Sequence, residues 1–197
     1  MRILKMNQKN FKDATEIVIG LIKEGKVIIF PTDTVYIPVA DATNKKAVRK
    51  VFQIKQRSQK TPFPIFVKDI KMAKKFARID KTQEKFLKTV WPGKITVVLK
   101  RRKTKTKLYG VAKDTIALRI PDFKPVNLLS EKLKIPLVGT SANISGKPAS
   151  GNLKKILSQL RNKEYQPDLV IDAGNLPKSK PSTVLDLTTL PPKILRP

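Results

Sequence analysis

Apolar residues recur in parts of this chain with the 3.6-residue period of a helix. Residues 11–24 place Val18 and Ile22 on one face, and Gly25 follows as a typical C-terminal stop. Residues 44–54 show the same spacing. We therefore predict two amphipathic helices that each bury one face against a core.

Other signals predict further helices. Asp69 and Asp80 are suitable N-caps of two successive short helices, because a carboxylate at that position accepts hydrogen bonds from free backbone N–H groups. The apolar spacing predicts two more helices, over residues 126–133 and 152–161.

Short runs of apolar and β-branched residues between these segments predict strands. Pro64 lies inside one run, and because proline cannot donate a ladder hydrogen bond, that strand belongs at a sheet edge or a bulge. The predicted strands cover residues 27–30, 63–67, 95–99, 116–120, 136–139, 169–172 and 183–187.

The alternation of helices and strands is typical of an α/β protein. Several connections are too short for parallel crossovers, which favours a mixed sheet. The chain has 197 residues and shows no linker, repeat or low-complexity block. We therefore expect residues 1–197 to form a single domain, a twisted mixed β-sheet flanked by helices.

The chain is strongly basic, with 42 Lys and Arg against 15 Asp and Glu and a net charge of +27. This excess favours anionic substrates or a polyanionic partner such as RNA. A lysine-rich genome or a salty habitat would give the same composition. The stretch from Lys100 to Lys107 carries six basic residues and no acid, so it could be a mobile hairpin tip, a nucleic-acid contact or a solvated loop.

Cysteine and histidine are both absent. Their absence excludes thiolate nucleophiles, histidine triads and the usual zinc sites, and leaves chemistry to Lys, Arg, Asp, Glu, Ser, Thr and Tyr. Transfers at phosphorus suit this set because they depend on positioning and on neutralising charge. No apolar run approaches the roughly 20 residues that span a bilayer. We expect no signal peptide, no membrane contact and a cytoplasmic location.

Three polar motifs follow predicted elements. After the first strand, period-two geometry would point Thr32, Thr34 and Tyr36 to one side, where their hydroxyls suit a small polar ligand. Asp33 and Thr34 could instead only stabilise a turn. Near a helix end, Lys55 and Arg57 form a two-pronged anion clamp, or simply a solvated basic terminus.

In the third motif, Ser141 and Asn143 face the same way after a short apolar strand, and Gly146 permits close backbone approach. Strand-end loops are common ligand sites in α/β proteins, although an ordinary polar loop has the same composition.

Taken together, these motifs resemble the YrdC/Sua5 family, the threonylcarbamoyl-AMP synthases. Their combination and order are specific, and the resemblance extends from about residue 10 to Arg196. The matching segments are Pro31 to Tyr36, Lys55 with Arg57, Pro92 to Thr96, Arg119-Ile120-Pro121, Ser141 with Asn143, and Ser182-Thr183-Val184.

The resemblance implies a YrdC/RibB-like fold and a nucleotidyltransferase. It implies that ATP, L-threonine and bicarbonate become threonylcarbamoyl-AMP and pyrophosphate, with Mg²⁺ held mainly by the ATP phosphates. The product would serve the threonylcarbamoyl modification of adenosine in tRNA, together with downstream tRNA-modification proteins. We also expect weak, nonspecific binding of RNA or tRNA.

The resemblance also implies roles for individual residues. Lys55 and Arg57 would be catalytic. The expected ATP-binding residues are Lys55, Arg57, Thr61, Ser141, Asn143 and Arg196. The expected threonine-binding residues are Thr32, Thr34, Tyr36, Arg119 and Ser182, with no protein ligand set for a metal.

Five positions depart from the family pattern. Ile37 and Pro38 replace a Gly-Leu pair, and Phe66 stands where many members have His. Ala149 replaces a frequent Ser, and Ser58 replaces the usual Pro. The Ile37-Pro38 change and the high charge leave open a catalytically impaired RNA-binding module of the same fold. A carbamoyl-adenylate enzyme with another substrate is a third reading.

Overall fold

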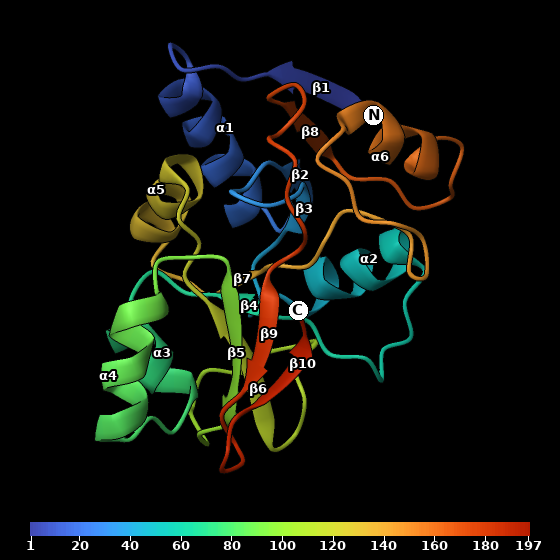
Figure 1. The fold of residues 1–197 in the computed structure, drawn as a ribbon. Coiled ribbons are helices and arrows are strands. Elements are labelled where there is room, and N and C mark those ends of the chain that lie inside the picture. The colour runs from blue at the N-terminus through green and yellow to red at the C-terminus, as the bar shows by residue number, and fades with distance from the viewer.

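The computed structural model describes all residues 1–197 and confirms the mixed α/β architecture (Figure 1). The helices are α1 (Phe11–Lys23), α2 (Lys45–Lys55), α3 (Ile70–Phe76), α4 (Lys81–Val90), α5 (Lys124–Leu133) and α6 (Leu153–Leu160). The strands are β1 (Arg2–Lys5), β2 (Ile28–Phe30), β3 (Ile37–Val39), β4 (Ile65–Phe66), β5 (Ile95–Lys100), β6 (Thr115–Arg119), β7 (Leu137–Val138), β8 (Leu169–Asp172), β9 (Thr183–Asp186) and β10 (Lys193–Arg196).

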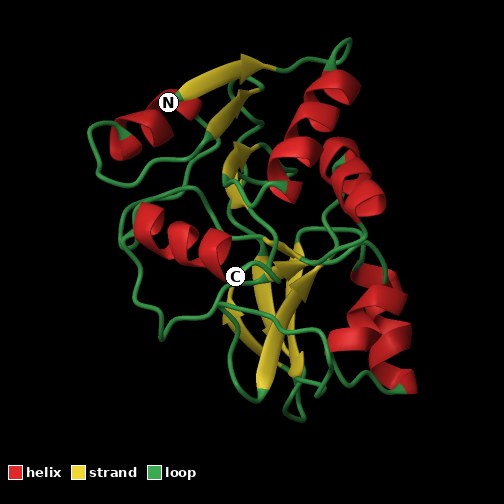
Figure 2. Ribbon diagram, turned by 180° about the vertical axis from the view of Figure 1, so that it is seen from behind, coloured by secondary structure: helices red, strands yellow, loops and turns green.

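The strands divide between two sheets rather than joining in one. The smaller sheet has the order β1-β8-β2-β3, and the larger has the order β10-β9-β5-β6-β4-β7. Both contain parallel and antiparallel pairs, as the short connections indicated. Seen from behind in Figure 2, helices flank the strands on both sides. No helix is both long and apolar enough to cross a membrane.

The two sheets meet where β3 leads toward β7. Val138 N donates to Ala40 O at 2.9 Å, and Ala42 N donates to Pro136 O at 3.0 Å. Asp41 and Leu137 form an antiparallel bridge between these hydrogen bonds. This junction joins the smaller sheet to the larger one and places the loops after β2 and β7 close together.

Two apolar clusters lie beneath the helices. A cluster of 32 buried residues contains Ile65, and a second cluster of 17 contains its neighbour Phe66. Because successive strand residues point to opposite faces, β4 separates the two cores. The predicted caps are confirmed: Asp69 accepts from Met72 N, and Asp80 forms a reciprocal capping box with Gln83.

The structure also contains strands that local patterns did not reveal. The prediction missed β1, β3 and β10, and β4 is shorter than the predicted strand over 63–67. Pro38 lies within β3, the edge strand of the smaller sheet, where a missing N–H is tolerated. Every residue of β10 is exposed, so it carries no apolar alternation.

Candidate functional site

A cavity of about 270 Å³ opens near the junction of the two sheets. We call it the arginine cavity, because three arginines from distant parts of the chain line it: Arg57, Arg119 and Arg196. Arg57 follows α2, Arg119 ends β6, and Arg196 ends β10. The structure therefore brings together segments that lie up to 139 positions apart in sequence.

Six of the predicted site residues line the arginine cavity and five do not. Those that line it are Thr34, Arg57, Arg119, Ser141, Ser182 and Arg196. Those outside its lining are Thr32, Tyr36, Lys55, Thr61 and Asn143.

Within the cavity, the charge of Arg196 repels the charges of the other two arginines. Burial lowers the pKa of Arg57, and the nearby charge of Arg196 lowers it further. Arg119 has a lowered pKa for the same two reasons, although Asp33 acts in the opposite direction. An anion bound among these groups would relieve the repulsion, and guanidinium groups match the oxygens of phosphate and carboxylate.

Arg119 is the most deeply buried of the three, with 3% of its side chain exposed. Its Nη2 lies 2.7 Å from each carboxylate oxygen of Asp33, and its Nε donates to Gly93 O at 2.9 Å. Nη1 lies 3.3 Å from Thr34 Oγ1, and the ring of Phe66 lies beneath the guanidinium. These contacts fix the guanidinium plane and leave Nη1 as the group directed at Thr34.

Lys55 holds the loop after β7 instead of facing the cavity. Its Nζ donates to Ser141 O at 2.5 Å and to Asn143 O at 2.8 Å, and it lies 3.3 Å from Asn143 Oδ1. Its backbone carbonyl accepts from Ser145 N at 2.8 Å. Burial, together with the charge of Arg57, lowers the pKa of Lys55 to about 7. The contacts make Lys55 a positioning residue for this loop.

The loop itself is closed by internal hydrogen bonds. Ser141 Oγ donates to Asn143 Oδ1 at 2.5 Å, and Asn143 Nδ2 donates to Lys147 O at 2.5 Å. Asn143 is therefore occupied within the loop, whereas Ser141 lines the arginine cavity. Alternation along an extended chain would point both side chains of the pair at one ligand. In the structure, only Ser141 lines the cavity.

Thr32 and Tyr36 make local contacts rather than lining the cavity. Thr32 Oγ1 donates to Val35 O at 2.7 Å and accepts from Thr34 N at 3.1 Å. Tyr36 is fully buried, and its hydroxyl donates to Gly174 O and accepts from Ala173 N. Burial raises the pKa of Tyr36 to about 12. Of the three hydroxyl residues of this motif, only Thr34 lines the arginine cavity.

Ser182 and Arg196 form the wall contributed by the C-terminal strands. Arg196 donates to Ser182 O from both Nε, at 3.1 Å, and Nη2, at 2.6 Å. The hydroxyl of Ser182 lies 2.8 Å from that of Thr96, and both residues are buried. Thr96 therefore supports a cavity residue from the neighbouring strand β5.

Arg57 is positioned by the segment that follows it. Its Nε donates to Thr61 O at 3.1 Å, its Nη2 donates to Pro62 O at 2.9 Å, and its guanidinium stacks over Phe63. Thr61 thus contributes a backbone carbonyl to Arg57, while its own side chain lies exposed.

Phe66 and Gly139 form the floor of the cavity in close contact. A Cβ atom added to Gly139 would lie 2.2 Å from the Phe66 ring, far inside any real contact distance. Gly139 is therefore required by the size of Phe66. Ile37 also lines the cavity, but only 2% of it is exposed and it packs within the cluster of 17 buried residues.

Two residues of the site escaped the sequence interpretation. Asp33 was considered only as a turn residue, because nothing local indicates that Arg119 would meet it. Thr96 belongs to the segment Pro92 to Thr96, which resembles the family, but the sequence predicts no contact for its side chain. The missing information was long-range: the pairing of β5 with β9 for Thr96, and the meeting of the two sheets for Asp33. Each brings partners 86 positions apart into hydrogen-bonding distance.

No group of three or more His, Cys, Asp or Glu side chains is arranged to hold a metal ion. Asp33, a carboxylate next to the cavity, is already bound to Arg119 and also accepts from Asp122 N. Asp33 is therefore engaged within the protein and is not free to act as a metal ligand.

Comparisons with known proteins match nearly the whole chain. The family model of the Sua5, YciO and YrdC proteins, described as "Telomere recombination", matches residues 20–197. A threonylcarbamoyl-AMP synthase of Pyrococcus abyssi is 34% identical over 182 residues, which are 92% of this chain and 53% of that protein. A Methanocaldococcus jannaschii protein that is provisionally named threonylcarbamoyl-AMP synthase is 37% identical over 187 residues. The match covers 95% of this chain and 86% of the Methanocaldococcus protein.

The fold is shared with solved structures. The crystal structure of P. abyssi Sua5 complexed with L-threonine superposes with a TM-score of 0.86 and 32% sequence identity, over 100% of this chain and 56% of that one. The chain thus spans about half the length of the Pyrococcus proteins it matches. This superposition confirms the predicted fold class.

Proposed function

The chain belongs to the Sua5, YciO and YrdC family, and from this premise we propose that it is a threonylcarbamoyl-AMP synthase. The reaction is an adenylyl transfer in which ATP, L-threonine and bicarbonate give threonylcarbamoyl-AMP and pyrophosphate. The observation that carries the proposal is the arginine cavity, where Arg57, Arg119 and Arg196 converge with Thr34 and Ser182.

In this proposal the ATP phosphates lie against Arg57 and Arg196. Both guanidiniums line the cavity, and both have a lowered pKa through burial, so a polyphosphate stabilises their charged forms. Ser141 supplies a hydroxyl to the nucleotide from the loop that Lys55 holds. Mg²⁺ bound to the ATP phosphates would neutralise part of their charge, and Arg57 and Arg196 would neutralise more of it.

Threonine lies at the other side of the cavity, near Thr34, Arg119 and Ser182. Arg119 keeps Asp33 on Nη2 and offers Nη1 to the threonine carboxylate, which would replace the long 3.3 Å contact with Thr34. Thr34 and Ser182 then supply hydroxyls for the polar groups of the substrate. P. abyssi Sua5 has been crystallised in complex with L-threonine, which supports this assignment.

The chemistry needs two bond-forming steps. The threonine nitrogen bonds to the bicarbonate carbon with loss of water, and a carbamate oxygen then bonds to the α-phosphorus of ATP while pyrophosphate leaves. The chain has no histidine, so we assign the amine proton to bicarbonate or to a substrate oxygen. The arginines neutralise the charge that develops on the phosphates.

The product would be consumed by downstream tRNA-modification proteins in the cytoplasm. Weak, sequence-independent binding of RNA or tRNA is consistent with the net charge of +27. A catalytically impaired RNA-binding module is not favoured, because backbone binding requires charge alone and not the buried Asp33–Arg119 arrangement that the chain retains.

The test is an assay of pyrophosphate release with each substrate omitted in turn. We expect release to require ATP, Mg²⁺, bicarbonate and L-threonine together, and an adenylate that contains threonine to accumulate. Pyrophosphate release that is indifferent to threonine would overturn the proposal and favour an enzyme with a different acceptor.

A further inference from the structure

A second hollow, of about 660 Å³, lies against the other side of β9 from the arginine cavity. Successive strand residues point to opposite faces, so Val184 lines the cavity whereas Leu185 lines the hollow. Phe86 of α4 and Leu190 of the β9–β10 turn add further apolar surface. In Figure 1 this region is at the lower end of the molecule, between α4 and that turn.

Cationic side chains border this hollow and form what we call the Arg78 face. Arg78 lines the hollow and two adjoining depressions. Arg102 and Lys103 line both of these depressions as well. The members of the Arg78 face are Arg78, Lys100, Arg101, Arg102, Lys103 and Lys113.

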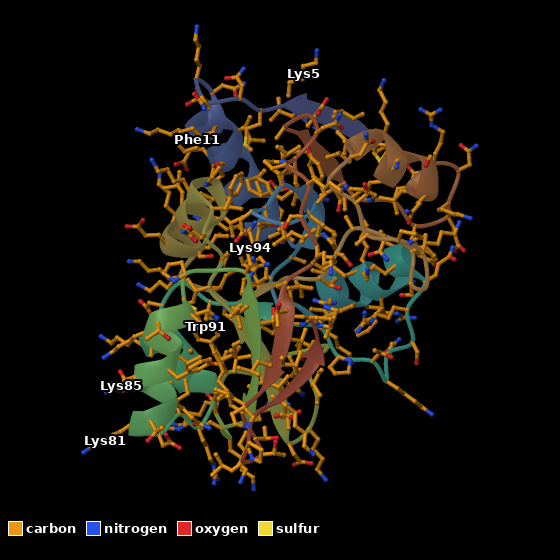
Figure 3. All side chains as sticks on the ribbon, viewed as in Figure 1. Lys5, Phe11, Lys81, Lys85, Trp91 and Lys94 are labelled. Carbon is orange, nitrogen blue, oxygen red and sulfur yellow. The ribbon has the colours of Figure 1, made fainter.

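The charge of the Arg78 face is not neutralised within the protein. None of its six cations takes part in an ion pair, whereas Lys74, which lines one of the two depressions, is paired with Glu84. Two carboxylates border the face: Asp80, which caps α4, and Asp114, which forms no ion pair, so the six cations keep an excess of positive charge. In Figure 3, Lys81 and Lys85 extend outward from the same helix and add to the positive field. The face therefore attracts a polyanion.

Four of the six cations, Arg78, Lys100, Arg101 and Arg102, stand on hydrogen-bonded backbone. Arg78 N donates to Lys100 O, and Arg102 N donates to Phe76 O, both at 2.8 Å. On the other side, Arg101 N donates to Asp114 O at 2.8 Å. The end of β5 is thus paired on both sides, which fixes the spacing of the charges around the hollow.

A ligand for this surface must combine negative charge with a flat apolar group. We propose that the Arg78 face binds single-stranded RNA, with phosphates on Arg78, Arg102 and Lys103 and an unpaired base against Phe86 and Leu190. Bases rest on aromatic and apolar side chains in such sites, while cations follow the backbone. The choice of RNA rests on the proposed function, because a product used for tRNA modification brings this polyanion near the enzyme.

The test compares two triple variants of equal charge. The first is R78Q/R102Q/K103Q, and the control is K12Q/K23Q/K154Q, whose lysines are exposed on α1 and α6 and form no ion pairs. Binding of a short labelled single-stranded RNA is measured over a series of salt concentrations. Each lost phosphate contact reduces the slope of log K against log salt by about 0.7, so the first variant should lose about 2 in slope and tenfold or more in affinity at low salt.

The control variant should lose far less affinity, and both variants should keep wild-type pyrophosphate release without RNA. Leu190→Ser, at a side chain that is 95% exposed, should weaken single-stranded RNA without destabilising the fold. Equal weakening by the two triple variants would overturn the proposal, since the binding would then be spread over the surface. Tighter binding of duplex RNA, or displacement of RNA by polyglutamate at equal charge, would also overturn it.

The RNA measurement is independent of the proposed activity. If wild-type protein released no threonine-dependent pyrophosphate, the proposed function would fail, while the contrast between the triple variants would still decide whether the Arg78 face binds RNA.

Discussion

Arg119 Nη2 lies 2.7 Å from both carboxylate oxygens of Asp33, a residue 86 positions earlier in the chain. Both side chains are nearly inaccessible, with 3% and 8% exposed. Asp33 therefore sets which guanidinium nitrogen remains for a substrate, and it keeps a buried cation compensated while the cavity is empty.

Asp33→Ala should destabilise the protein and weaken threonine binding. Removing one partner of a buried pair leaves an uncompensated charge, and we expect the free energy of unfolding to fall by about 3 kcal/mol. The KM for threonine should rise more than the KM for ATP, because Arg119 loses its orientation. Urea unfolding and steady-state kinetics check both. Asp13→Ala, at an exposed and unpaired position of α1, is the control. Equal effects of the two variants would contradict the assigned role.

Arg57→Ala should lower the rate of pyrophosphate release by tenfold or more. One charge-assisted hydrogen bond to a phosphate accounts for about 1.5–3 kcal/mol. Stability should change little, by about 1 kcal/mol, for the lost contacts with Thr61 O and Pro62 O. Arg49→Ala on the exposed side of α2 provides a matched control. Normal activity in a markedly destabilised Arg57 variant would show that Arg57 is structural.

Lys55 should make stability rise with pH above neutrality. Its pKa is about 7 in the folded protein against an ordinary value of 10.5, so the unfolded chain binds more protons between these values. Stability therefore increases as the pH rises through this window. Unfolding measured at several pH values should show a steeper rise for the wild type and for the control Lys46→Met than for Lys55→Met. Identical slopes would mean that the three oxygen acceptors keep Lys55 protonated.

Ile37→Gly should destabilise the fold. Ile37 packs within the cluster of 17 buried residues and pairs with Phe30 in the sheet. Removing its side chain leaves a cavity and loosens the strand, at a cost of about 3 kcal/mol or more. Thermal unfolding measures the loss, and calorimetry shows whether threonine binds more tightly. A variant as stable as the wild type would show that Ile37 is dispensable to the core.

Local patterns predicted most helices, their caps and the interior strands, because period and capping depend on neighbours in sequence. They did not separate the two sheets, since strand pairing between segments such as β1 and β8 depends on contacts 167 positions apart. Strand β10 is exposed along its whole length and shows no alternation of apolar and polar residues, so the sequence pattern did not predict it.

The motifs include six residues that line the arginine cavity, but they did not predict the direction of each side chain. Period-two geometry assumed an extended chain from Thr32 to Tyr36, whereas Thr32 closes a turn onto Val35. Lys55 has the residue type of a phosphate ligand, but its three acceptors are oxygens of a loop 86 and 88 positions away. Neither outcome follows from residue type and spacing alone.

The contact between Phe66 and Gly139 restricts the order in which these positions can evolve. Any side chain at 139 collides with the present ring, because its first carbon would lie 2.2 Å from it. A substitution of Phe66 by a smaller residue must therefore occur first, and only then can position 139 accept a residue larger than glycine. Conversely, a lineage that acquired a side chain at 139 could not regain Phe66 in a single step. The two positions should covary among relatives, and saturation mutagenesis of 139 should recover variants only in a background where 66 is reduced.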